Sequence, residues 1–283
     1  MKEALFYDKL DSGRVHCRLC PTECVIPSGK RGACGVRLNK EGVLYSEIYG
    51  RITSLNLDPI EKKPLYHYHP GEFILSIGTK GCNFHCDFCQ NWQISQDCNA
   101  PTREVTSAEI VADARKQVSF GIAYTYNEPF IWYEFVLETA KLAKENGLEN
   151  VLVTNGYVNS APLDGILPYI DAMNVDLKAF NGKFYRKVCR GALEPVLETL
   201  KRARGRCHIE LTTLIIPTLN DSAGEMEKEA DWIRDNMGPD TPLHLSRYFP
   251  CYKIKLPPTP METMERAAEI ARRKLKYVYL GNV

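Results

Sequence analysis

Three of the eleven cysteines in this chain of 283 residues lie in one short stretch, GCNFHCDFCQNW. Cys82, Cys86 and Cys89 have the spacing C-x3-C-x2-C. Tetrahedral zinc sites and iron–sulfur cubanes usually take four cysteines, and Cys98 is a weak candidate for a fourth ligand. Three thiolates therefore indicate a zinc site that lacks a ligand, a chance grouping, or a [4Fe–4S] cube with one open iron. Such an iron could bind a small molecule through nitrogen and oxygen.

A second group of cysteines, Cys17, Cys20, Cys24 and Cys34, has the spacing C-x2-C-x3-C-x9-C. Four thiolates could close a tetrahedral zinc site or hold a second cubane, and the spacing matches neither zinc-ribbon pairs nor the bacterial ferredoxin run. Zinc would pin a turn-rich segment that is too short to build its own core, whereas a cluster would relay electrons. The pattern favours a bound metal of structural role and leaves open zinc, an iron–sulfur cluster and four unliganded cysteines.

The composition is that of a soluble globular protein, with 44% hydrophobic and 25% charged residues. A net charge of +1 gives no electrostatic footprint for nucleic acid or an anionic membrane. The chain has no apolar run of about 18 residues, and its first residues, MKEALFYDKLDSGRVHC, lack the apolar stretch expected of a signal peptide. We therefore expect a cytoplasmic protein, in which clustered cysteines serve metal binding or catalysis rather than disulfides. The scattered cysteines Cys98, Cys189, Cys207 and Cys251 are expected to be small buried hydrophobes.

The elements that must position these residues alternate along the chain after about residue 70. Short apolar runs typical of buried parallel strands cover residues 73–79, 122–126, 151–155, 172–177, 208–216 and 242–248. Amphipathic stretches of helical length cover residues 106–118, 130–147, 194–205, 223–238 and 261–275. Six such units predict parallel strands with helical crossovers, in a doubly wound sheet or an incomplete barrel.

Polar motifs follow four of the predicted strands. Cys82, Cys86 and Cys89 follow the first predicted strand. The next three strands are followed by NEP (127–129), TNG (154–156) and DLK (176–178). The carboxyl ends of parallel strands meet at one rim, where barrel enzymes place their chemistry. The sequence therefore predicts a single site at this rim.

The C-x3-C-x-aromatic-C loop after the first strand resembles the radical S-adenosylmethionine (SAM) superfamily. The resemblance implies a partial (β/α)6 TIM-type barrel over residues 71–283, preceded by a cysteine-rich, metal-binding segment over residues 1–70. It implies a [4Fe–4S] cluster on Cys82, Cys86 and Cys89, whose open iron chelates SAM. One electron would cleave the sulfonium, and the 5′-deoxyadenosyl radical would abstract a substrate hydrogen.

The rim motifs resemble the SAM-binding segments of the same superfamily. Two departures stand out, because the glycines of the usual Gly-Gly-Glu-Pro segment are absent and Val153 replaces an acid that often precedes TNG. LTTLIIPTLND resembles the segment that flanks the adenine. The SAM-binding residues that the resemblance implies are Asn127, Glu128, Thr154, Asn155, Asp176, Lys178 and Ile216.

A narrower resemblance covers essentially the whole chain. The stretches CRLCPTECVIPSGKRGACGVR, TYNEPFIWYE and HLSRYFP look like the radical enzymes of the so-called AmmeMemoRadiSam system, relatives of pyruvate formate-lyase activating enzymes. This implies a radical SAM enzyme of unknown substrate, served by an electron donor such as ferredoxin or flavodoxin. A glycyl-radical-enzyme activase, acting on a protein substrate, is the alternative within the family. A non-catalytic iron–sulfur electron carrier or sensor is the alternative from another class.

Two charged features near the rim have simpler explanations. Glu61, Lys62 and Lys63 are expected on a solvated face, although they precede the first strand and could gate the rim. Arg247 at the tip of the last predicted strand could contact substrate or cofactor, or be solvated.

Overall fold

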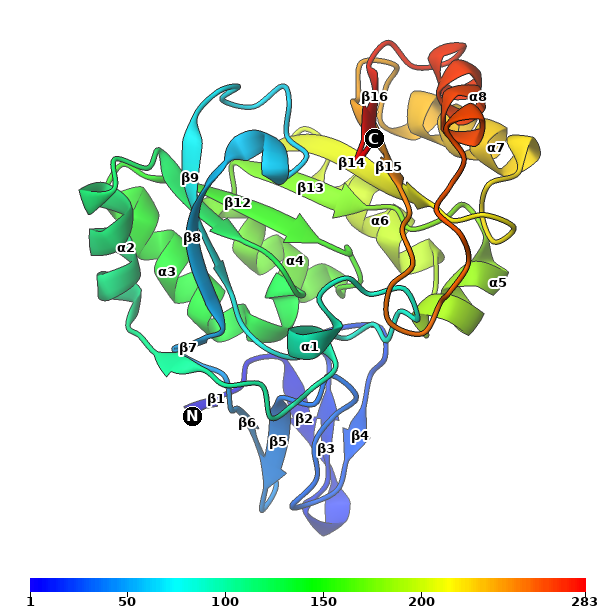
Figure 1. The fold of residues 1–283 in the computed structure, drawn as a ribbon. Helices are drawn as coiled ribbons and strands as arrows, with labels where there is room; N and C mark the ends of the chain where they lie inside the picture. The colour runs from blue at the N-terminus through cyan, green and yellow to red at the C-terminus, as the bar shows by residue number, and fades with distance from the viewer.

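An eight-stranded sheet forms the centre of the protein, in the order β16-β15-β14-β13-β12-β11-β9-β8 (Figure 1). In this computed structural model, which describes residues 1–283, all neighbouring strands of the sheet are parallel except β8 and β9. The strands are β8 (Ser54–Pro59), β9 (Phe73–Gly78), β11 (Gly121–Tyr124), β12 (Glu149–Thr154), β13 (Ala172–Asp176), β14 (His208–Ile215), β15 (Leu243–Arg247) and β16 (Val278–Gly281). The sheet stays open, with β8 and β16 at its edges, which confirms the predicted α/β fold with a partial barrel.

Helices connect the parallel strands, and α2, α3, α4 and α6 lie on one face of the sheet (Figure 1). The helices are α1 (Trp92–Ser95), α2 (Ser107–Lys116), α3 (Tyr133–Glu145), α4 (Ser160–Ile166), α5 (Gly182–Phe184), α6 (Glu194–Ala203), α7 (Ala223–Asn236) and α8 (Met261–Arg272). Thr106 begins α2 with a capping box, because its side chain accepts from the backbone of Glu109 and the Glu109 carboxylate accepts from the backbone of Thr106. No helix in the structure is both long enough and apolar enough to cross a membrane.

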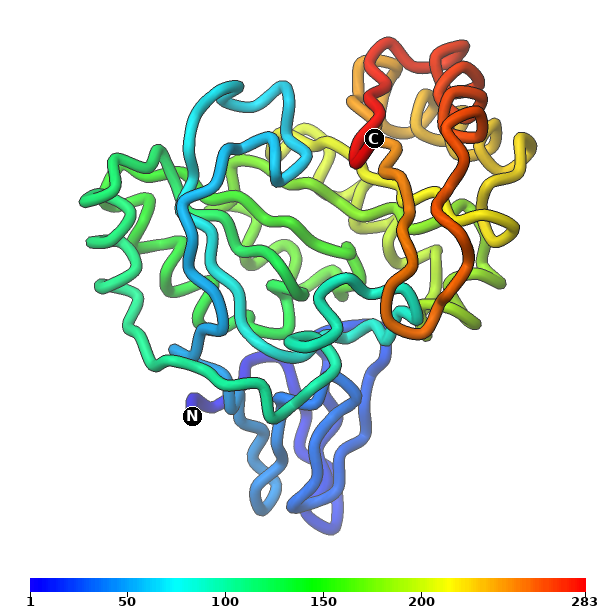
Figure 2. Tube along the Cα trace, in the orientation of Figure 1, coloured from blue at the N-terminus to red at the C-terminus, as the bar shows by residue number.

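The N-terminal part folds into two three-stranded antiparallel sheets, which project from the large sheet as the blue segment in Figure 2, and a third, two-stranded sheet pairs residues 51–52 with residues 103–104. Their strands are β1 (Lys2–Glu3), β2 (Tyr7–Lys9), β3 (Val15–Cys17), β4 (Val25–Ile26), β5 (Arg37–Lys40), β6 (Val43–Ser46), β7 (Arg51–Ile52) and β10 (Arg103–Glu104). A buried ion pair fastens this part to α3, since Arg37 Nη2 lies 2.8 Å from Glu134 Oε2. The Trp132 indole adds a hydrogen bond of 2.6 Å to the Ile48 carbonyl. Residues 54–59 already belong to the large sheet as β8.

The loop between β8 and β9 closes the end of the sheet opposite the cysteines. Its residues Tyr66 and His67 donate their backbone N–H groups to the Glu210 carboxylate of β14, at 3.0 and 2.7 Å. Burial opposes ionisation of this carboxylate, but His208 and His244 outweigh it and lower the pKa of Glu210 to about 2. The loop thus links strand β8, at one edge of the sheet, to the strands near the other edge.

Candidate active site

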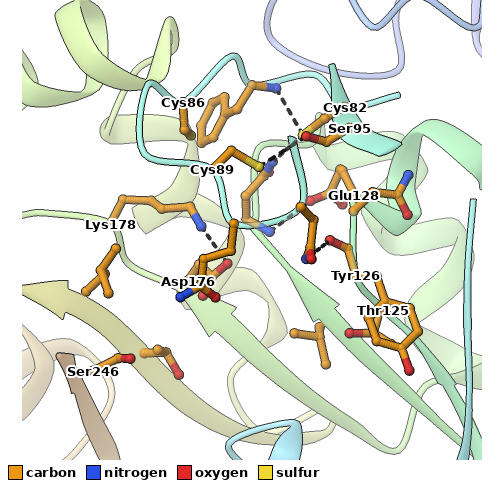
Figure 3. Close-up of a pocket in the computed structure, with 18 of the residues that line it drawn as sticks. Cys82, Cys86, Cys89, Ser95, Thr125, Tyr126, Glu128, Asp176, Lys178 and Ser246 are labelled. Atoms are coloured by element: carbon orange, nitrogen blue, oxygen red, sulfur yellow. Dashed lines mark hydrogen bonds and ion pairs between the residues drawn. The ribbon is translucent and has the colours of Figure 1, made fainter. Parts of the chain in front are cut away.

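A pocket of about 650 Å³ opens at the carboxyl ends of the parallel strands. Every strand from β11 to β15 supplies lining residues directly or through the loop that follows it, and the loop after β9 supplies the three cysteines. Figure 3 shows Cys82, Cys86 and Cys89 above the Lys178–Asp176 pair, with Glu128 beside them. The predicted convergence of the rim motifs on one site is therefore what the fold produces.

The three cysteines share a loop whose shape depends on Gly81. This glycine has φ of +86°, and a Cβ there would lie 2.7 Å from the carbonyl oxygen of Cys34. Hydrogen-bond partners already face the sulfurs, since the backbone N–H of Phe84 lies 3.4 Å from Cys82 Sγ and Ser95 Oγ lies 3.1 Å from Cys89 Sγ. Donors of this kind stabilise thiolates that hold a metal cluster.

A π-helical turn, Tyr185–Cys189, supports the cysteine loop from the other side. Its carbonyl groups accept from the backbone of the loop, with 2.9 Å between His85 N and Cys189 O. The Cys189 thiol lies beside Cys86, and this contact together with burial raises the pKa of the Cys86 thiol. The Cys251 thiol lies 3.5 Å from the Cys89 carbonyl oxygen. Nothing in the local sequence of Cys189 and Cys251 indicates that they lie beside the cysteine loop.

Glu128 is a carboxylate that is only 1% exposed and yet lines the pocket. It accepts hydrogen bonds from Thr154 Oγ1 and the backbone of Asn155, both at 2.8 Å. Burial raises the pKa of Glu128 to about 7 despite these donors. Thr154 stands behind Glu128 rather than in the lining, so its role is to orient the carboxylate.

Two amides connect the rim motifs to the cysteine loop. Asn127 donates to the Gly81 carbonyl at 2.8 Å. Asn155 donates to Asn83 Oδ1 at 2.9 Å and lies 3.8 Å from Cys82 Sγ. Both residues line the pocket, so the NEP and TNG motifs hold the loop as well as face the cavity.

Asp176 and Lys178 form an ion pair on the wall of the pocket, with 2.6 Å between Nζ and Oδ2. Burial works against the Lys178 ammonium, but Asp176 and Cys86 outweigh it and the pKa of Lys178 is raised. The DLK motif therefore presents a paired cation and anion next to the thiols.

Ile216, like Thr154, is a predicted cofactor residue that does not line the pocket. Strand β14 ends at Ile215, and the chain then turns so that Ile216 is fully buried, with its backbone bonded to Asn220 Oδ1 at 2.7 Å. Thr212 and Leu214, which alternate on the inner face of β14, line the cavity instead. The adjacent Arg247 also lies outside the lining, because its Nε bonds the Thr259 carbonyl at 2.8 Å.

The far side of the pocket carries charged groups from the segment before β9, for which a solvated face was expected and a place at the rim was the alternative. Lys63 is buried, contrary to the expected solvated face, and lies 2.8 Å from Asp58 Oδ2. Tyr126 and Lys62 also bond this carboxylate, at 2.7 and 3.0 Å. Burial opposes ionisation of Asp58, but the three donors outweigh it and hold its pKa well below the usual range. The only sign of this charged cluster in the sequence is that Lys62 lies four residues after Asp58, a spacing that is common for ion pairs on the surface.

The N-terminal cysteines gather elsewhere. Cys17, Cys20, Cys24 and Cys34 line a second, smaller pocket in the N-terminal segment. Cys98 belongs to neither pocket, since its sulfur packs against Gly35. It is therefore no fourth ligand for the active-site cysteines.

The residues of the large pocket fit a three-cysteine cluster and SAM. Three thiols with hydrogen-bond donors aimed at sulfur suit an iron–sulfur cube that leaves one iron open. Glu128 and Asp176 are carboxylates suited to an ammonium or sulfonium group, and the volume of about 650 Å³ is ample for a ligand of that size.

Comparison with known proteins agrees with this chemistry. The Radical SAM superfamily profile matches residues 76–233. A protein from Methanocaldococcus jannaschii, described as uncharacterized, is 49% identical over 288 residues, covering 100% of this chain and 86% of the relative. The pyruvate formate-lyase 1-activating enzyme of Escherichia coli is 24% identical over 212 residues, covering 68% of this chain and 85% of that enzyme.

Solved structures share the fold at low sequence identity. A radical SAM methyltransferase from Sphaerobacter thermophilus superposes with a TM-score of 0.59 at 18% identity, covering 75% of this chain and 67% of that one. Streptococcus suis SuiB bound to S-adenosylmethionine gives a TM-score of 0.56 at 12% identity, covering 74% and 51%.

Proposed function

Because the chain belongs to the radical SAM superfamily, whose enzymes use a [4Fe–4S] cluster and SAM, we propose that its large pocket is the site of reductive SAM cleavage. Cys82, Cys86 and Cys89 would hold the cluster. When bound, the reduced cluster supplies the electron that breaks the sulfonium bond of SAM and so the radical that takes hydrogen from a substrate. The observation that carries the proposal is that the three thiols and the buried Glu128 carboxylate face the same cavity.

The protein residues position the ligand and exclude water. Glu128, held by Thr154 and Asn155, offers a carboxylate to the methionine ammonium group. The Asp176–Lys178 pair offers one charge of each sign to the polar end of the cofactor. Phe84 and Phe88 line the cavity beside the cysteines and keep water from the sulfurs.

A glycyl-radical-enzyme activase is the second candidate within this chemistry. Relatives that are named as activating enzymes support it, among them one from Clostridium pasteurianum that is 24% identical over 166 residues, covering 55% of this chain and 67% of that enzyme. Its substrate would be a protein chain entering the pocket between the carboxyl ends of the strands. The electron would come from a ferredoxin or flavodoxin, in keeping with a reducing, cytoplasmic setting for so many free cysteines.

The test is anaerobic reconstitution with iron and sulfide, reduction with dithionite, addition of SAM, and measurement of 5′-deoxyadenosine. We expect product from the natural chain and none from Cys86→Ala. Cys207→Ala is the matched control, because this cysteine lies outside both pockets. A fully loaded, reduced natural chain that forms no product would overturn the proposal in favour of an electron carrier or sensor.

A further inference from the structure

Four cysteines that the active site does not use are brought together by the turns of the N-terminal sheets. Cys17 ends β3, Cys20 and Cys24 lie in the turn before β4, and Cys34 precedes β5. All four are free thiols. The backbone N–H of Ala33 already points at Cys24 Sγ, at 3.4 Å, as in sites where sulfur carries charge.

The buried guanidinium of Arg37 faces the same pocket, and not all of its nitrogen atoms have hydrogen-bond partners. Arg37 is 1% exposed, and its Nη2 atom bonds both Glu134 oxygens, at 2.9 and 2.8 Å. Its Nε and Nη1 atoms are buried with no hydrogen-bond partner, and Arg37 lines the cysteine pocket. Leaving buried donors unpaired is costly. An anionic group held by the thiolates would satisfy this guanidinium.

Both a zinc ion and a cube would use all four thiolates. A closed zinc site gathers its ligands around one point, whereas a cube takes one thiolate at each corner. The four cysteines line one shared pocket, and the amounts of iron and sulfide that they bind distinguish the two groups.

The second pocket also adjoins the active-site loop. Asn83, between Cys82 and Cys86, lines the N-terminal pocket while its amide bonds Asn155 at the active site. His85 in the same loop lies 3.0 Å from the Ala33 carbonyl oxygen, through Nε2. The Asn83 side chain thus connects the lining of the N-terminal pocket to Asn155 in the lining of the active site. Two neighbouring thiolate sites suit redox groups better than an isolated structural ion.

We propose that Cys17, Cys20, Cys24 and Cys34 bind a second iron–sulfur cube, with Arg37 as its buried counter-charge. This goes beyond SAM cleavage and does not depend on it. The natural chain would then hold about eight iron atoms, in two clusters of four.

The test uses the full chain with Cys82→Ala, Cys86→Ala and Cys89→Ala, loaded anaerobically with ferrous iron and sulfide. We expect about four iron and four sulfide per chain, and a paramagnetic resonance signal on reduction that SAM does not alter. Adding Cys20→Ser and Cys24→Ser should remove that iron, whereas adding Cys207→Ser should not. Because this chain lacks the active-site thiols, the result is independent of whether the natural chain cleaves SAM.

Two outcomes would overturn the proposal. One is iron uptake no higher than in the chain that also carries the two serine substitutions, with circular dichroism showing both folded. The other is about one zinc per chain on purification, with no iron bound after reconstitution. If the triple variant does not fold, the natural chain decides, because about four iron atoms per chain instead of about eight would also contradict a second cube.

Discussion

Glu128 is the residue whose charge should decide how tightly the large pocket binds SAM. Its carboxylate is buried, and burial raises its pKa to about 7, so a bound ammonium would favour the ionised form. Glu128→Gln keeps the shape but loses a charge-assisted bond worth roughly 1.5–3 kcal/mol. We expect SAM affinity to fall about tenfold or more, measured by calorimetry on cluster-loaded protein. Glu149→Gln, at the opposite end of β12, is the control, and equal affinity in both variants would contradict the role.

Glu229 in α7 is a second buried carboxyl. The Thr213 hydroxyl, which lies 2.9 Å from the Leu177 carbonyl, also contacts Glu229. Burial outweighs this contact and raises the pKa of Glu229 from 4.5 to about 8, which favours the protonated form at neutral pH.

This raised pKa predicts a stability that falls as the pH rises. The native state holds the Glu229 proton more tightly than the unfolded chain does. The contribution of this proton to the free energy of unfolding is therefore full below pH 4.5 and is lost as the pH rises from 4.5 to about 8. Glu229→Gln cannot ionise and can still hydrogen-bond to Thr213. As the pH rises from 4.5 to about 8, the free energy of unfolding of the natural chain should therefore drop relative to that of the variant by several kcal/mol, at about 1.4 kcal/mol per pH unit. Urea unfolding at pH 5, 7 and 9 measures this, and parallel curves would refute it.

At the scale of elements, alternation of apolar runs and helical stretches predicted the six inner strands and five long helices. It did not predict the edge strands β8 and β16. β8 reads SLNLDP, with the polar Ser54, Asn56 and Asp58 on one face and both leucines on the other left unburied. Its position therefore depends on pairing with β9 rather than on burial of apolar side chains. The helix α4 was also missed, because SAPLDGI contains Pro162 and Gly165, residues of low helix propensity.

The attachment of the N-terminal segment to α3 is likewise a matter of tertiary contact. Arg37 and Glu134 lie 97 positions apart in sequence and form a buried pair. Arg37→Leu leaves the Glu134 charge buried with only the Leu5 N–H as a partner. We expect a loss of about 3–5 kcal/mol in the free energy of unfolding of the cluster-free protein.

The double variant Arg37→Leu with Glu134→Leu should recover most of that loss, because it leaves no unpaired charge. Denaturant unfolding of the natural chain, both single variants and the double variant gives the coupling energy. Additive effects would show that the two side chains do not depend on each other.

For the whole molecule, the sequence predicted which motifs meet but not how the two parts interlock. Order along the chain placed the cysteines, Glu128, Asn155, Asp176 and Lys178 at one rim, and the structure has them lining one cavity. It could not show that Lys63 faces that cavity or that Ile216 does not, since both depend on where a strand ends and the chain turns. Nor could it show that the N-terminal segment contacts the active-site loop.

Gly81 lies at this contact between the two parts, and its replacement tests whether they act together. An alanine Cβ there would lie 2.7 Å from both the Cys34 carbonyl oxygen and Val36 Cγ1. Gly147 has a similar positive φ, +71°, with nothing within 4 Å, so Gly147→Ala carries only the backbone strain of roughly 1–2 kcal/mol. We expect Gly81→Ala to cost roughly 1–3 kcal/mol more than this control.

The same substitution should also reduce iron uptake at both cysteine sites, because the cysteine loop and the Cys34 turn must move apart together. Iron is measured in Gly81→Ala and Gly147→Ala, each with and without the three active-site Cys→Ala changes. If iron is lost only from the active-site thiols, the turn at Cys34 can shift without disturbing the N-terminal cysteines. Equal iron and equal stability in the two glycine variants would mean that the contact places no constraint on either site.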